Sequence, residues 1–160
     1  MSNITVGISD WALSKKTEDT IITYSLGSCL GVTVYDAQAH VGGMVHCQLP
    51  SCSTEDKTKA IQNPAMFVDT GVSLLFQKFF DAGGHKSRMV VKAAGCAAIL
   101  DANGFFRIGE RNVTLFRKLL WKNGILLNGS EVGGDVSRTL VLNMATGKTF
   151  IRSKGEEREI

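Results

Sequence analysis

The sequence predicts a protein of the α+β class that is rich in short strands. Apolar and β-branched residues alternate with polar ones in several short segments near both ends of the chain, as in half-buried strands. Two longer segments instead place apolar residues every three or four positions, as amphipathic helices do. A chain of 160 residues can bury a core without disulfides or metals, and we expect one domain over residues 1–160.

Four strands are predicted in the N-terminal third of the chain. Around residues 4–9, Ile and Val alternate with Thr, Gly and Ser, which predicts a strand with one buried face. Residues 20–26 (TIITYSL) are rich in β-branched and aromatic side chains and predict a second strand. Residues 30–35 and 41–49 predict a third and a fourth strand, joined by a turn over residues 36–40.

The helical pattern occupies two segments. Pro64 stands at the first position of a helix predicted over residues 64–82, and a pair of glycines closes it. A second helix is predicted over residues 108–123, with Gly124 as its left-handed C-terminal cap.

The remaining apolar segments predict further strands. These segments are residues 88–94, 125–127, 139–142 and 148–152. The charged tail over residues 152–160 is expected to be frayed.

Composition argues against several classes of function. The net charge of +3 is scattered, without interleaved basic and aromatic residues, so we expect no nucleic acid partner. No apolar run approaches the roughly 18 residues that cross a bilayer, and the N-terminus lacks the pattern of a secretory signal. We therefore expect a cytoplasmic protein that does not insert into membranes.

The four cysteines are interpreted as thiols. Without signs of export, a disulfide framework is not expected. His46, Cys47 and Cys52 lack the paired spacing of a zinc site, so we expect no metal and no cofactor. Cys47 and Cys96 are expected to be small buried hydrophobic residues, whereas Cys29 has an unusual setting.

Cys29 lies between two glycines, in the stretch LGSCLG. The spacing is that of a nucleophile elbow, but residues 32–35 predict a strand where the elbow requires a helix. Gly27 and Gly31 would still let a substrate approach closely and let backbone N–H groups converge on an oxyanion. The alternative is a glycine-rich β-bulge that holds an inert cysteine.

A catalytic cysteine needs a base, and His46 is the candidate. His40 and His85 fall in loops, whereas His46 falls in a strand predicted to pair with the one that leaves Cys29. A four-residue loop over residues 36–39 would place His46 opposite Cys29. A five-residue loop would place the two on opposite faces unless the glycines form a bulge.

Thr23 is the candidate to orient the imidazole. It lies six residues before Cys29 on the preceding strand, where its hydroxyl could accept a hydrogen bond from His46. The alternative is that this threonine reflects β propensity alone. Asp36 and Asp101 are carboxylate rivals for the same role.

Four stretches in order along the chain resemble the chemoreceptor glutamine deamidase family, CheD: ITYSLGSCLGVTVYD, VGGMVHCQLP, FRIGERNV (residues 106–113) and EVGGDVSR (residues 131–138). The resemblance implies deamidation of glutamines on the cytoplasmic helical bundle of methyl-accepting chemotaxis receptors. It implies a triad of Cys29, His46 and Thr23. It also implies a layered α/β sandwich of mixed, largely antiparallel sheets flanked by helices, similar to the catalytic domains of deamidating toxins.

The resemblance further implies a CheC-type phosphatase as a partner. We also expect Gly27, Ser28 and Gly43 to contact the substrate. Two other functions are alternatives: a regulatory binding module for the phosphatase with little catalysis of its own, and a redox sensor in which Cys52 is the resolving thiol. A methylated glutamate presents a similar carbonyl, so methylesterase activity on the same receptors is an alternative that ranks below deamidation.

Overall fold

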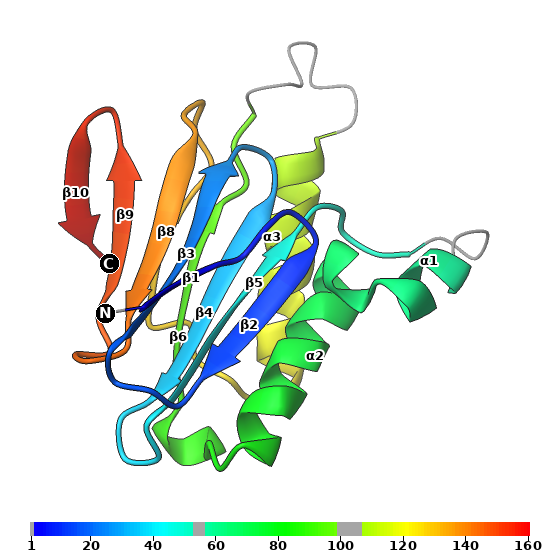
Figure 1. Cartoon of the computed structure of the whole chain (residues 1–160). Coiled ribbons are helices and arrows are strands. Elements are labelled where there is room, and N and C mark those ends of the chain that lie inside the picture. Colours follow the sequence, from blue (N-terminus) through cyan, green and yellow to red (C-terminus); the bar gives the residue numbers. More distant parts are fainter. Residues whose placement is uncertain (1, 53–56, 99–106) are drawn as a thin grey trace.

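Two five-stranded sheets lie face to face in the computed structural model, which describes residues 2–52, 57–98 and 107–160 (Figure 1). The first sheet, called sheet A here, has the strand order β1 (Ser2–Thr5), β3 (Asp19–Leu26), β8 (Arg138–Asn143), β9 (Thr149–Ser153) and β10 (Glu156–Glu159). The second, sheet B, has the order β2 (Asp10–Ser14), β5 (Val41–Cys47), β4 (Leu30–Asp36), β6 (Val90–Gly95) and β7 (Gly129–Val132).

Most neighbouring strands in both sheets are antiparallel. The parallel pairs are β1 with β3 in sheet A and β6 with β7 in sheet B. The helices α2 (Val68–Asp81) and α3 (Ile108–Lys122) cover the face of sheet B that points away from sheet A (Figure 1). The predicted α+β class, with mixed and largely antiparallel sheets flanked by helices, is therefore confirmed.

Alternation along β4 and β5 fills two apolar layers. Val32, Val34 and Val45 point toward α2 and α3 and pack with helix residues such as Phe79 and Phe116. Their neighbours point the other way, between the sheets, where the buried side chains include Tyr35, Met44, Leu140, Leu142 and Ile151. Because β4 and β5 are covered on both faces, every residue in them is buried.

Several predicted boundaries differ from the structure. Pro64–Met66 form a separate 3₁₀ turn (η2), and α2 begins only at Val68 because Phe67 is extended, with φ −111° and ψ 144°. The strand predicted over residues 88–94 is preceded by a second 3₁₀ turn, η3 (Lys86–Arg88), and begins at Val90. The first strand ends at Thr5, and Ile8 is exposed.

Other elements were missed or misplaced. Neither β2 nor the short helix α1 (Lys57–Gln62) was predicted. The strand predicted over residues 125–127 forms instead as β7, and the side chain of Asn128 accepts a hydrogen bond from the backbone of Val91 just before it. The tail that was expected to fray contains β10, which pairs with β9 and is tied to Glu131 through Arg158.

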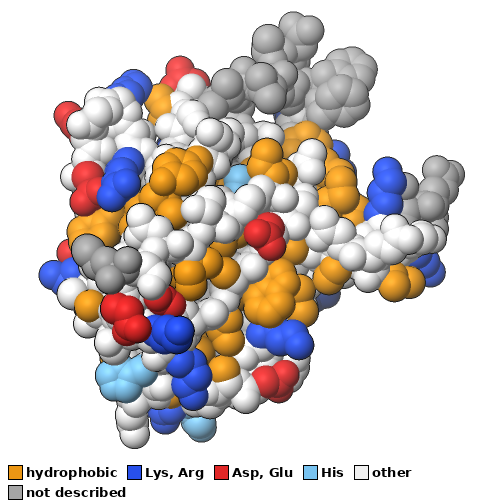
Figure 2. Space-filling model, in the orientation of Figure 1, with side chains coloured by type: hydrophobic (Ala, Val, Ile, Leu, Met, Phe, Trp, Pro, Cys, Tyr) orange, Lys and Arg blue, Asp and Glu red, His pale blue; other side chains and the backbone are white. Residues whose placement is uncertain are grey.

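The surface carries charges of both signs. Figure 2 shows one face, where hydrophobic side chains gather in patches across the middle while Lys, Arg, Asp and Glu lie mainly toward the edges. None of the described helices is both long enough and apolar enough to cross a bilayer.

Candidate active site

The chain crosses from sheet A to sheet B twice at the same end of the sandwich. Residues 6–9 connect β1 to β2, and residues 27–29 connect β3 to β4 (Figure 1). Both crossings occur at one end because β1 and β3 are parallel. Cys29 therefore lies where the two layers are joined by backbone, half-buried, directly before the first residue of β4.

A bulge in β3 precedes the crossing. Thr23 pairs with Leu140 and Leu26 pairs with Arg138, so two residues of β3 oppose one residue of β8. The second of them, Ser25, has a positive φ of 59°. The extra residue bends the strand before residues 27–29, which we call the Cys29 loop.

The Cys29 loop is held from behind by the end of β6. Cys96 N–H donates to the carbonyl of Cys29 at 2.8 Å, and Ala97 N–H donates to that of Gly27 at 2.8 Å. Gly95 adopts φ 104°, and a Cβ added there would lie 2.2 Å from the Cys29 carbonyl oxygen. Only glycine permits this approach of the two backbones.

His46 and Thr23 contact each other across the two sheets. Thr23 Oγ1 lies 2.7 Å from His46 Nδ1 and 2.7 Å from the carbonyl oxygen of Val6. Because a carbonyl can only accept, the hydroxyl donates to Val6 and must accept from an Nδ1–H group. In the neutral imidazole this leaves Nε2 unprotonated, with its lone pair available.

The free nitrogen of His46 is buried without a partner among the described residues. Burial lowers the pKa of His46 to about 4, so the ring is a neutral base near pH 7. Burial raises the pKa of the Cys29 thiol, and the hydrogen bond from its own backbone N–H opposes this only in part. The resting site therefore holds a neutral thiol and a neutral imidazole, and no hydrogen bond joins Cys29 to Nε2.

Cys47 and Cys96 are more deeply buried than Cys29. Burial raises the pKa of Cys47 far above its usual range and that of Cys96 to about 12, so neither supplies a thiolate near pH 7. Both thiols are free and their side chains belong to the apolar core, as predicted.

The predicted pairing of Cys29 with His46 is wrong. The turn has four residues, but it spans residues 37–40, so that Asp36 pairs with Val41 and Gly31 pairs with His46. The turn starts one residue later than expected because the Asp36 carboxylate accepts from the N–H groups of two turn residues. The register is therefore shifted by two residues from the expected one. Side chains two residues apart on a strand point to the same face, so His46 still lies on the expected face of sheet B.

Two other expected residues lie elsewhere. Asp36 is at the opposite end of β4, where it binds Arg88, and so it is no partner for His46. A Cβ on Gly43 would meet Leu13 and Leu75, which places this glycine on the helix side of β5. A substrate-binding role for Gly43 does not fit this position. Asp101 lies outside the described residues.

Asn112 was missed by the sequence analysis. It lies on the buried side of α3, fully inaccessible to solvent, and its Nδ2 donates to the carbonyls of Ser28 at 2.9 Å and Gln48 at 3.3 Å. The sequence feature that could have identified it is its position: Asn112 is a polar residue on the apolar side of the predicted helix, which also includes Gly109, Phe116 and Leu120.

The stretch EVGGDVSR supports the Cys29 loop from a greater distance. Arg138 is buried, and its Nε lies 2.7 Å from Glu131 while its Nη1 donates to the carbonyl of Gly95 at 3.1 Å. Gly133 N–H donates to the same carbonyl. Gly95, whose backbone packs against Cys29, is thus held by a buried arginine that forms a partly buried ion pair.

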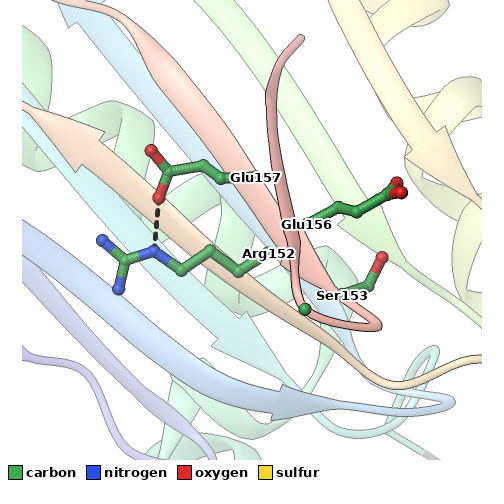
Figure 3. A pocket seen from close by; sticks show the side chains of 5 residues that line it. Arg152, Ser153, Glu156 and Glu157 are labelled. Carbon is green, nitrogen blue, oxygen red and sulfur yellow. Dashed lines mark hydrogen bonds and ion pairs between the residues drawn. The ribbon is translucent and has the colours of Figure 1, made fainter.

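A separate cleft lies at the β9–β10 hairpin, lined by Arg152, Ser153, Gly155, Glu156 and Glu157 (Figure 3). An ion pair between Arg152 and Glu157 crosses it. β9 is two strands from β3 in sheet A, so this cleft is not part of the site around Thr23.

Comparison with known proteins gives one family. A family model described as CheD chemotactic sensory transduction matches residues 48–153. The chain is similar to a probable chemoreceptor glutamine deamidase CheD 1 of Syntrophus aciditrophicus, at 45% identity over 97% of this chain and 96% of that protein. Similar proteins named probable chemoreceptor glutamine deamidase CheD occur in Solibacter usitatus, at 41% identity over 100% of this chain and 94% of the relative, and in Pyrococcus horikoshii, at 38% over 100% and 98%.

Among solved structures, a Neisseria meningitidis protein of the DUF152 family model aligns with a TM-score of 0.47 and 12% identity. The alignment covers 84% of this chain and 63% of that one.

Proposed function

This chain belongs to the CheD chemotactic sensory transduction family, and we propose that it deamidates glutamine side chains of chemoreceptors with Cys29 as nucleophile, His46 as base and Thr23 as the residue that orients His46. The observation that carries the proposal is the contact between Thr23 and His46. It leaves a buried, unprotonated nitrogen at the end of the sandwich where Cys29 lies.

The first step is attack on the glutamine carboxamide. The Cys29 thiol gives its proton to Nε2 of His46, and the sulfur bonds to the carboxamide carbon. Since burial favours the neutral form of both groups, this transfer takes place in the substrate complex, once the sulfur and Nε2 are within hydrogen-bond distance. The oxyanion accepts from backbone N–H groups of the Cys29 loop, where Gly27 and Ser28 contact the substrate. One such donor is worth about 3 kcal/mol in the transition state.

The second step releases ammonia. The C–N bond breaks, the imidazolium gives its proton to the leaving nitrogen, and a thioester remains on Cys29. Water then adds to the thioester carbon while His46 takes a proton from it, the C–S bond breaks, and the sulfur recovers that proton. The products are glutamate and ammonia, and the protein residues named here supply each proton transfer.

The target is a glutamine on the cytoplasmic helical bundle of a chemotaxis receptor, which places the protein in the cytoplasm. A CheC-type phosphatase is the second partner. The names of the similar proteins support the chemoreceptor as target. The phosphatase, like the helical bundle as the site of the glutamine, is supported by the family resemblance alone.

Ammonia release from purified receptor fragments tests the function. We expect the wild-type protein to convert specific glutamines to glutamates, seen by mass spectrometry. The Cys29→Ala variant should lose the activity while it still binds the fragment, and Cys52→Ala is the control that should keep the activity. Substantial ammonia release by Cys29→Ala would contradict the mechanism. A wild type that binds a CheC-type phosphatase and releases no ammonia would favour a regulatory module instead.

A further inference from the structure

We propose that Asn112 is a positioning residue that fixes the peptide between Ser28 and Cys29, so that the N–H of Cys29 is aimed at the oxyanion. The inference rests on the proposed function above, and it adds a side chain of α3 to the site.

Three successive carbonyl groups of the Cys29 loop are turned toward the body of the protein. The carbonyls of Gly27 and Cys29 accept from the backbone N–H groups of Ala97 and Cys96. The carbonyl between them, on Ser28, accepts from Nδ2 of Asn112 at 2.9 Å. The middle peptide of the loop is therefore the one held by a side chain.

The orientation of the carbonyls determines that of the N–H groups. In a planar trans peptide the C=O and N–H bonds point in opposite directions. The N–H groups of Ser28 and Cys29 therefore point away from α3 and β6. Neither donates to a carbonyl within the part of the chain that the structure describes. The N–H of Cys29 lies instead against its own sulfur. A donor beside the nucleophile is suitably placed for the oxyanion that forms on the carbon under attack.

The side chain of Asn112 is held rigidly in place. One helical turn earlier, Gly109 packs so closely on the end of β6 that an added Cβ would lie 2.5 Å from the Cys96 carbonyl oxygen. Nδ2 also donates to the carbonyl of Gln48, two residues after His46. One amide group thus joins the loop of the nucleophile to the segment that directly follows the strand of the base.

The unpaired atom of Asn112 indicates what the amide is for. Its Oδ1 is buried and has no partner in the described parts of the chain. Reversing the amide would place this oxygen against two carbonyl oxygens, so the orientation is fixed by its neighbours. An unpaired buried acceptor is unfavourable, and an apolar side chain would avoid it. What an apolar side chain cannot supply is the bond from Nδ2 to the Ser28 carbonyl.

The experiment compares Asn112→Ala and Asn112→Asp with the wild type. Asp keeps the volume of the side chain and replaces the donor by an acceptor. For both variants we expect kcat to fall about 100-fold, as for the loss of one oxyanion donor, while KM changes less than about three-fold. Asn123→Ala is the matched control, since Asn123 Nδ2 donates to the Leu119 carbonyl at the exposed end of the same helix. That variant should keep its kcat.

Alkylation of Cys29 by iodoacetamide distinguishes misorientation of the Cys29 N–H from a general loss of structure. Alkylation requires the thiol but forms no oxyanion, so its rate in Asn112→Ala should stay within about three-fold of that of the wild type. A parallel loss of alkylation and kcat would show that Asn112 merely keeps the thiol in place, and would overturn the inference. If the wild type is active and both Asn112 variants keep its kcat, the inference is overturned as well. An inactive wild type would instead overturn the proposed function, and this inference with it.

Discussion

The hydroxyl of Thr23 gives the two nitrogens of His46 different roles. Because Thr23 donates to Val6, it accepts from Nδ1 and leaves Nε2 as the base. Thr23→Ser should keep substantial activity, because it keeps the oxygen. Thr23→Val keeps the shape and removes the oxygen, so kcat for ammonia release should fall about 10- to 100-fold.

The control for this prediction is Thr33→Val. Thr33 is another buried threonine between the sheets, and its Oγ1 lies 3.2 Å from that of Thr149. Its loss should cost about 1 kcal/mol of stability and leave kcat unchanged. Equal losses of kcat in Thr23→Val and Thr33→Val would mean that Thr23 contributes to stability alone.

The buried imidazole of His46 determines the acidic limb of the rate profile. Its pKa of about 4 means that the base becomes protonated, and therefore inactive, only well below the usual value near 6.5. We expect kcat/KM for ammonia release to stay level from neutral pH to about pH 5 and to fall toward pH 4. A limb centred at or above pH 6.5 would contradict a buried neutral base.

Stability changes in the same range and must be followed in parallel. Between about pH 6.5 and 4 the unfolded chain binds a proton at His46 that the folded chain does not, so this residue lowers stability as the pH falls. Circular dichroism at each pH separates loss of fold from loss of the base.

At the residue level, the sequence alone identified those candidate site residues that have unusual neighbours along the chain. Glycines flank Cys29, and His46 interrupts an apolar strand, so both were recognised. No comparable sequence pattern surrounds Asn112. A single polar residue in an amphipathic helix gains meaning only when the helix packs, since the buried side of α3 also includes Gly109 and Phe116.

At the element level, Asp36 holds the β4–β5 hairpin to the chain beyond α2. Its buried carboxylate binds Arg88 and accepts from the backbone N–H groups of Gln38, Ala39 and His85. Burial raises the pKa of Asp36, but these bonds outweigh burial and lower it to about 2. Asp36→Asn should therefore cost about 2 kcal/mol at pH 7.

The pH dependence identifies the cause. A carboxylate with a lowered pKa stabilises the fold above its unfolded value near pH 4, and this contribution is lost as the pH falls toward 2. Urea unfolding midpoints of wild type and Asp36→Asn should differ at pH 7 and 5 and converge toward pH 2. Asp81→Asn, at an exposed helical carboxylate that accepts from Gln77, is the control with little effect at any pH. A gap that persists at low pH would contradict the charge-based explanation.

The elements that the sequence failed to predict each lack the local pattern by which such elements are recognised. β10 (EERE) is a charged edge strand, and charges at an edge oppose aggregation while they hide the strand pattern. α1 (KTKAIQ) buries no residue and so has no apolar stripe to recognise. β2 (DWALS) lacks a run of β-branched residues, and its place is fixed by pairing with β5.

At the scale of the whole molecule, the partition of the described strands between two sheets could not be predicted from local patterns. β3 and β4 are separated by three residues, which suggests a hairpin, yet they belong to different sheets. β3 instead pairs with β8, more than a hundred residues later in the chain. Such pairings depend on which apolar faces meet, and local periodicity does not report that.

Two sheets packed face to face can still slide over each other in two directions and rotate about the axis perpendicular to both. Apolar contact opposes these movements only weakly, because it has no preferred direction. Hydrogen bonds between points on the two layers do have direction, and those near the site restrict this freedom: Thr23 to His46, and Arg138 to the carbonyl of Gly95. The first of these bonds lies inside the proposed catalytic group. The angle of the imidazole is therefore a property of how one whole layer is placed on the other, and substitutions far from Cys29 that let the layers slide would misalign the base.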